Sequence, residues 1–147
     1  MKKCVFCKLI KEIKKGKGRS FIAELKNSYA LLAVRQYFKG YCILFTKSHK
    51  EHTHKIPMRV QKGLYEDMMR VAAAIDKVFK PARFNYENLG NSTNHIHWHV
   101  IPRYKNDKYK KLPIWQIPEK VRKGKLTAKE VEEIKKKLKK YLQFNCS

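Results

Sequence analysis

The fold is decided by one stretch of the chain, His95-Ile96-His97-Trp98-His99-Val100-Ile101-Pro102-Arg103. Histidines alternate with apolar residues here, and side chains two apart in a β-strand point to the same face. We therefore predict a strand with three imidazoles on one face, about 6–7 Å apart in succession, and an apolar ridge on the other. Half of the six histidines in the chain lie in this stretch, which indicates a chemical site rather than a half-exposed strand.

The segments before this strand predict an antiparallel α+β domain. Alternating apolar residues predict a hairpin of strands at 20–25 and 29–34, and the apolar run at 41–46 predicts a strand buried on both faces. Apolar residues at three- and four-residue spacing from 58 to 79 predict a long helix, and residues 83–89 predict a further strand. We therefore expect a sheet of about five antiparallel strands that packs against the long helix.

The C-terminal part of the chain predicts a separate helix. Thr127 and Glu130 have the spacing of a capping box, in which each side chain bonds a backbone N–H at the start of a helix. Lysines cover most of this helix, apart from an apolar stripe at Val131, Ile134 and Leu138. We expect a domain at residues 1–118 and a helical extension at 119–147. The apolar stripe predicts that this helix docks on the domain; the alternative is that it forms a surface for nucleic acid or a partner.

The composition fits one folded domain without a membrane-spanning segment. The chain has 147 residues, 43% of them hydrophobic, and no run approaches the roughly 20 apolar residues of a spanning helix. The basic N-terminus holds no signal-type apolar segment, so we expect a cytoplasmic protein. A formal charge of +23 attracts polyanions, but the lysines are spread over every segment, which favours a lysine-rich host proteome over nucleic-acid binding.

Four residues have the chemistry of a metal site. We predict residues 1–20 as a Cys-x-x-Cys turn followed by a lysine-rich segment, and Cys4 and Cys7 supply two thiolates for a tetrahedral metal. His49 and His95 are the candidates for the other ligands, and a Cys₂His₂ site leaves no open position, so the zinc would be structural. Two other histidines share the loop of His49 and are alternative third ligands: His52 and His54. Free thiols or a redox pair are the alternatives to a metal.

His97 is the best-placed imidazole for chemistry if a metal or a backbone carbonyl holds His95. A neutral imidazole, with an unperturbed pKa of about 6.5, is a good nucleophile near neutral pH. Attack on phosphorus gives a phosphoramidate that protonation makes labile, so the intermediate turns over in water. His99 is placed to contact a phosphate oxygen or to protonate the leaving group, and Asn91 and Ser92 lie in the turn before the strand. Such a site needs no catalytic cofactor.

The histidine strand is similar to the His-φ-His-φ-His-φ-φ signature, with φ apolar, of the histidine triad (HIT) superfamily of nucleotide hydrolases and transferases. Four other segments resemble the branch related to diadenosine tetraphosphate hydrolases: Tyr37-Phe38-Lys39-Gly40-Tyr41-Cys42-Ile43-Leu44, Lys47-Ser48-His49, Asn85-Tyr86-Glu87-Asn88-Leu89-Gly90-Asn91 and Pro102-Arg103-Tyr104. The resemblance covers roughly residues 3–116, and the C-terminal helix lies outside it.

The resemblance implies a homodimer, with an antiparallel sheet across its interface, and attack by the central histidine on the α-phosphate of a nucleotide. Carried over by position, His97 is the nucleophile that forms a covalent nucleotidyl-histidine, and His99 contacts phosphate or donates a proton. Asn85 and Asn91 would contact ribose or phosphate, and Ser92 would serve the leaving group.

Zinc-binding members of the superfamily similarly use an N-terminal Cys-x-x-Cys, a histidine placed like His49 and the first triad histidine. One departure is Thr93-Asn94, where the branch more often has an apolar residue and proline. The implied substrates are dinucleoside polyphosphates or nucleoside phosphoramidates, and the implied chemistry is hydrolysis or nucleotidyl transfer. The alternative from another class is a non-enzymatic nucleotide or nucleic-acid binding protein on the same fold.

Overall fold

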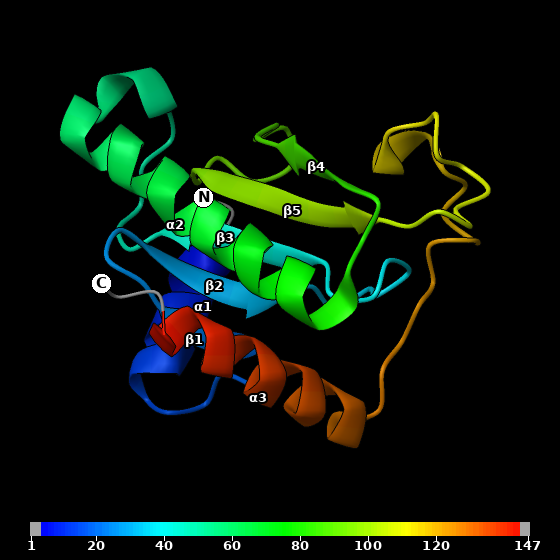
Figure 1. The fold of residues 1–147 in the computed structure, drawn as a ribbon. Helices are drawn as coiled ribbons and strands as arrows, with labels where there is room; N and C mark the ends of the chain where they lie inside the picture. The colour runs from blue at the N-terminus through cyan, green and yellow to red at the C-terminus, as the bar shows by residue number, and fades with distance from the viewer. Residues whose placement is uncertain (1–3, 145–147) are drawn as a thin grey trace.

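A five-stranded antiparallel sheet forms the centre of the fold, which a computed structural model describes for residues 4–144 (Figure 1). The strands are β1 (Phe21–Glu24), β2 (Ser28–Leu32), β3 (Cys42–Thr46), β4 (Arg83–Glu87) and β5 (His97–Arg103). Their order across the sheet is β1-β2-β3-β5-β4, and each neighbouring pair is antiparallel. The α+β class and the positions of the strands predicted from the apolar patterns are thereby confirmed.

Helices cover both faces of this sheet. They are α1 (Val5–Lys14), α2 (Met58–Phe79) and α3 (Ala128–Phe144), with single 3-10 turns η1 (Thr53–Lys55) and η2 (Ile114–Gln116). Figure 1 shows α2 and α3 side by side on one face and α1 behind the sheet on the other. The bounds of α2 agree with the predicted long helix. None of the helices within residues 4–144 has the length and apolar character needed to cross a bilayer.

The strand period divides the core between these two faces. Ala30, Leu44 and Val100 point to the face of α2 and α3, where they pack in the principal core. Tyr29 and Phe45 point to the opposite face and pack with residues of α1. Because β2 and β3 are covered from both sides, their residues are apolar almost without a break, as the run at 41–46 indicates.

Two expectations for the chain were wrong. The segment after the first cysteine is not a turn with a lysine-rich tail but the helix α1, whose buried residues Phe6 and Ile10 lie one turn apart and face the sheet. The histidine strand begins at His97 rather than His95, because the backbone at His95 leaves the strand register and turns its ring toward the N-terminus. In the observed arrangement, Cys4 and Cys7 at the start of α1 lie next to His95.

The C-terminal helix α3 is part of the principal core. Thr127 and Glu130 form the predicted capping box, in which the Thr127 N–H donates to the Glu130 carboxylate at 2.8 Å and the Glu130 N–H donates to the Thr127 hydroxyl at 3.2 Å. Ile134, Leu138 and Leu142 are buried in the same cluster as the apolar residues of α2. The helix therefore completes the layer that covers the sheet.

Candidate active site and metal centre

Two histidines of β5 lie on the sheet face that α1 covers. His97 is opposite Phe45 of β3, and His99 is opposite Ile43 of β3 and Glu87 of β4. Both imidazoles are buried, and their ring centroids are 5.0 Å apart. The alternation of the sequence thus brings these two imidazoles together, whereas His95 reaches the same region from the turn before the strand.

The hydrogen bonds of His97 define its tautomer. Its Nδ1 lies 2.7 Å from the carbonyl oxygen of His95. A carbonyl oxygen can only accept, so Nδ1 carries the proton and Nε2 keeps a free lone pair. The Asn88 amide donates to the His97 carbonyl at 2.6 Å, and the Phe6 ring centroid is 4.8 Å from the imidazole. The result is a buried imidazole with a fixed tautomer, a fixed orientation and a lone pair on Nε2.

His99 is held as a neutral imidazole. Burial, and secondarily the neighbouring His97, lower the pKa of His99 to about 4. Its Nδ1 lies 2.5 Å from the Tyr41 hydroxyl, and burial raises the pKa of Tyr41, so the phenol keeps its proton. With the hydroxyl as donor, Nδ1 accepts, and Nε2 of His99 carries the proton. This nitrogen can donate to an anionic oxygen.

Trp115 closes one side of the site. Its ring centroid is 5.2 Å from that of His99, and its indole N–H donates to the Glu87 carboxylate. The Arg122 guanidinium lies 5.6 Å from the centroid of the same indole ring. Sequence analysis missed Trp115, because its place in η2 depends on a long loop whose path no local pattern predicts.

Four side chains converge on one point between α1 and the start of β5. The ligand atoms of Cys4, Cys7, His49 and His95 all lie within 4.8 Å of one another. The closest pairs are Cys4 Sγ to His95 Nδ1 at 3.4 Å, Cys7 Sγ to His49 Nδ1 at 3.4 Å and Cys7 Sγ to His95 Nδ1 at 3.7 Å. Around a tetrahedral zinc ion with bonds of about 2.0–2.3 Å, ligand atoms are about 3.3–3.8 Å apart. The cluster therefore fits a metal ion.

Outer hydrogen bonds orient both imidazole ligands. His95 Nε2 donates to the Thr46 carbonyl at 2.9 Å, so that Nδ1 presents its lone pair to the cluster. His49 Nε2 lies 3.3 Å from the Glu51 carboxylate. Burial opposes ionisation of the Cys4 thiol, but hydrogen bonds from the backbone of Cys7 and from His49 hold its pKa below the ordinary value. The lowered pKa favours the Cys4 thiolate, which is the form in which a cysteine binds a metal, whereas burial and the neighbouring Cys4 raise the pKa of Cys7.

The alternative ligands do not reach this cluster. In the described part of the chain, His52 and His54 lie outside the group of ligand atoms, and their rings face each other with centroids 5.6 Å apart. They line a pocket of about 470 Å³ that also reaches His97, Asn88 and Gly90. The site thus has two neighbouring parts, a metal cluster on one side of His95 and an open pocket on the other.

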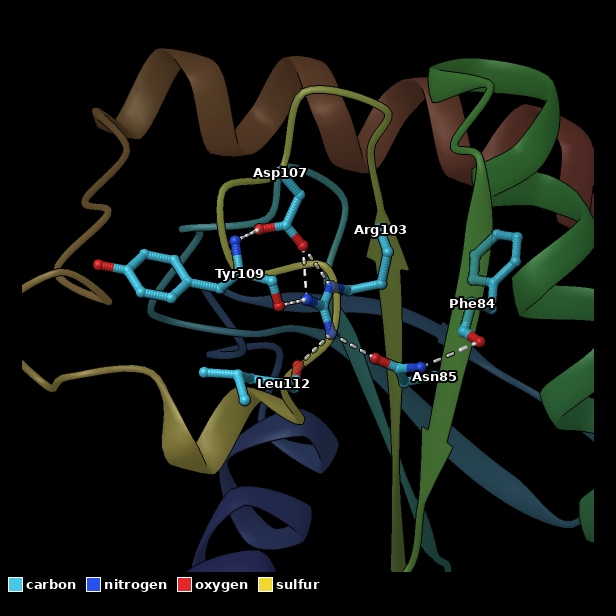
Figure 2. Close-up of polar contacts among 6 residues, drawn as sticks. All are labelled: Phe84, Asn85, Arg103, Asp107, Tyr109 and Leu112. Atoms are coloured by element: carbon cyan, nitrogen blue, oxygen red, sulfur yellow. Dashed lines mark hydrogen bonds and ion pairs between the residues drawn. The ribbon is translucent and has the colours of Figure 1, made fainter.

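The three other predicted site residues lie on β4 and in the loop before β5. Asn91 and Ser92 are exposed in the loop before β5, as the polar turn indicates. The Asn85 side chain lies farther along β4, where its Oδ1 accepts a hydrogen bond from Arg103 at 2.7 Å. Figure 2 shows this amide facing the Arg103 guanidinium, with its Nδ2 toward the Phe84 carbonyl.

Fold and site together define a class: small α+β domains that carry a histidine triad on an antiparallel sheet. The family model described as the HIT domain matches residues 14–106, more than half of the chain. The chain belongs to the HIT family.

Individual relatives agree with this membership. The chain is 31% identical to Protein hit of Bacillus subtilis over 107 residues, which cover 69% of this chain and 71% of that protein. It is 27% identical over 112 residues to adenosine 5′-monophosphoramidase hnt1 of Schizosaccharomyces pombe, covering 72% and 77%. A zinc-bound histidine triad family protein from Mycobacterium smegmatis has a similar fold, with a TM-score of 0.70, 24% identity, and coverage of 96% of this chain and 94% of that one.

Proposed function

We propose that this protein is a nucleotide phosphohydrolase or nucleotidyl transferase in which His97 attacks the α-phosphate of a nucleotide. The observation that carries the proposal is the 2.7 Å hydrogen bond between His97 Nδ1 and the His95 carbonyl, because it leaves a lone pair on a buried Nε2. Membership of the HIT family and the name of the Schizosaccharomyces pombe relative, a monophosphoramidase, support this reaction class.

The reaction has two steps. In the first, His97 Nε2 forms a bond to phosphorus, and the bond between phosphorus and the leaving group breaks. The leaving group keeps the electron pair and takes a proton from the Ser92 hydroxyl, which recovers one from water. In the second, water attacks the nucleotidyl-histidine and loses a proton to solvent, the electron pair of the P–N bond returns to His97 Nε2, and a nucleoside monophosphate is released. Another acceptor in place of water makes the protein a transferase.

His99 acts as a hydrogen-bond donor in this scheme. Because its pKa is about 4, it is neutral near neutral pH, and its Nε2–H stabilises the charge that develops on a phosphate oxygen. Asn91 and Asn85 are assigned to the ribose or the phosphate. The exposed position of Asn91 in the loop before β5 supports its assignment, whereas Asn85 already accepts from Arg103 through Oδ1 and donates from Nδ2 to the Phe84 carbonyl at 3.4 Å.

The metal at Cys4, Cys7, His49 and His95 is proposed to be zinc, with a structural role. Two thiolates and two imidazoles form a closed tetrahedral set, and the ion would supply a cross-link between α1 and the start of β5. We also propose a cytoplasmic homodimer paired through β4, which is an edge strand of the sheet. Residues 119–147 are proposed as an extension added to the HIT domain.

Product analysis tests the proposed reaction. Wild type and His97→Asn are each incubated with diadenosine tetraphosphate and with adenosine phosphoramidate, and the nucleotides are separated. Wild type should cleave at least one substrate at the α-phosphate, and His97→Asn neither. The melting temperature of the variant should stay within about 3 °C of wild type, since the ring faces a pocket and the cost is of the order of 1 kcal/mol. Equal cleavage by both proteins contradicts the proposal.

One observation favours the alternative of a nucleic-acid binding protein. A second pocket of about 420 Å³ is lined by Arg83, Lys105, Lys110 and Lys111, away from the triad. Phosphate contacts by such cations release counterions, so that binding of an oligonucleotide weakens steeply with salt. Tight oligonucleotide binding in wild type without turnover of either nucleotide favours this alternative over the enzyme.

A further inference from the structure

Two histidines remain without a role in the metal cluster or the triad. His52 and His54 lie on the loop before α2, both exposed, with ring centroids 5.6 Å apart. Together they place four ring nitrogens in the wall of the pocket that reaches His97. Exposed side chains gathered in the wall of a concave site are more informative than the same residues on a flat surface, because a ligand can contact them simultaneously.

The pocket has the shape and chemistry of an anion site. Its other lining groups include Asn88 and Gly90, and no heavy atom beyond Gly90 and its chain neighbours lies within 4 Å of the position that a Cβ would take there. Glu51 is the one carboxylate that lines the pocket, and its oxygen is directed at His49 Nε2 at 3.3 Å. The two imidazoles and the side chains of Thr53 and Gln61 offer hydrogen-bond donors, and Asn88 keeps one N–H besides the one that it donates to the His97 carbonyl.

The position of the pocket relative to His97 indicates what the anion is. In the proposed reaction the α-phosphate lies on His97 Nε2, so a group bonded to that phosphate extends into the volume that His97 shares with His52 and His54. An amine leaving group is small and has no oxygens for these donors. A second phosphate has several, and it carries a negative charge that strengthens each hydrogen bond.

We propose that His52 and His54 form a subsite for the phosphate chain of the leaving group, so that the protein prefers nucleotides whose α-phosphate carries further phosphates over nucleoside phosphoramidates. This inference rests on the proposed function, and it names the substrate class within it. The two histidines select the substrate by contact with its leaving group and take no part in bond making.

The double variant His52→Ala/His54→Ala tests the subsite with the two substrates named above. The ratio of kcat/KM for diadenosine tetraphosphate to kcat/KM for adenosine phosphoramidate should fall about tenfold, the loss expected for hydrogen bonds to a charged group. Lys55→Ala is the matched control, because Lys55 is exposed on the same turn but does not line the pocket. An unchanged ratio in the double variant overturns the proposal. So does an equal fall of the ratio in Lys55→Ala.

A binding measurement separates failure of the subsite from failure of the proposed function. Tripolyphosphate is titrated into wild type, the double variant and Lys55→Ala at constant salt, and the metal content of each protein is measured. The dissociation constant should rise about tenfold in the double variant alone, with the metal content unchanged. If wild type cleaves neither substrate but this difference persists, the reaction is wrong and the subsite stands. Equal affinity in all three proteins overturns the subsite.

Discussion

His99 is a buried base that titrates far below its ordinary range, and this makes stability depend on pH. The unfolded chain takes up the proton near pH 6.5, whereas the folded protein takes it up only near pH 4. Between pH 4 and 6.5 the unfolded state therefore binds more protons than the folded state, so the free energy of unfolding rises with pH in this range. Above pH 6.5 the contribution of His99 to stability is complete.

We predict that protonation of His99 lowers the free energy of unfolding by up to about 3 kcal/mol as the pH is lowered from 6.5 to 4. Urea unfolding at a series of pH values measures the slope. His99→Gln keeps a polar side chain without a titratable group, so its curve should be flatter by the same amount. Parallel curves for the two proteins contradict the assignment.

Arg103 is the second residue whose environment has a measurable consequence. All five of its N–H groups have partners: Asp107 receives two hydrogen bonds, and Asn85 and the carbonyls of Tyr109 and Leu112 receive the others (Figure 2). Both side chains of the ion pair are almost fully buried. The planar guanidinium thereby holds the loop that leads from β5 to Trp115, which contacts His99.

Arg103→Lys should destabilise the protein by about 3 kcal/mol, because a lysine keeps the charge but leaves buried acceptors without donors. Arg83→Lys is the control, since Arg83 is exposed at the paired position on β4, and its effect should stay within about 0.5 kcal/mol. Chemical denaturation measures both. A small effect for Arg103→Lys means that the loop holds its shape without this network.

At the scale of elements, the strands and α2 were predictable because their apolar residues repeat with the period of one structure over several turns or alternations. The helix α1 was not predicted, although Phe6, Leu9 and Ile10 have helical spacing, because the cysteine motif and the lysines led us to expect an irregular segment. The four ligands of the cluster were named from the Cys-x-x-Cys spacing, from the chemistry of histidine and from the resemblance to zinc-binding members of the superfamily. Tyr41, Asn88 and Trp115 carry no such chemical signature, and only their place beside the triad makes them part of the site.

The helix α3 has a testable role in the principal core. Leu138 is 1% exposed and packs among apolar residues of the sheet and α2. Leu138→Ala should lower the free energy of unfolding by about 2–5 kcal/mol, whereas Lys136→Ala on the exposed side should change it by less than about 0.5 kcal/mol. Thermal unfolding of both variants measures the difference. If both variants match wild type, α3 is only loosely docked.

At the scale of the whole molecule, the cluster of Cys4, Cys7, His49 and His95 joins the start of α1 to the segment that leads into β5. Removal of the metal with a strong chelator, or the double variant Cys4→Ser/Cys7→Ser, should lower the melting temperature and the metal content more than the rate per folded site. Atomic absorption, calorimetry and single-turnover rates measure the three quantities. Loss of chemistry with an intact fold and unchanged melting temperature means that the metal acts in catalysis.

The edge of the sheet predicts the oligomeric state. β4 has a free side, and Tyr86 on this strand and Tyr65 on α2 are 41% and 59% exposed. Sedimentation equilibrium should give twice the chain mass for wild type and the monomer mass for Tyr65→Glu/Tyr86→Glu, because buried carboxylates oppose pairing. Val34→Glu, at an exposed apolar residue away from β4, should leave the dimer intact. A wild-type monomer contradicts this interface.

The position of α3 in the principal core also affects how the chain folds on the ribosome. The sheet and α2 leave the exit tunnel before α3, so their apolar face is open to solvent until the last layer has been synthesised. An incomplete sheet of this kind exposes surface that promotes aggregation between nascent chains. The positive charge distributed along the chain makes such intermediates repel one another. The lysines, which contribute little to the fold, thus oppose aggregation of the growing chain until α3 has been synthesised and covers the core.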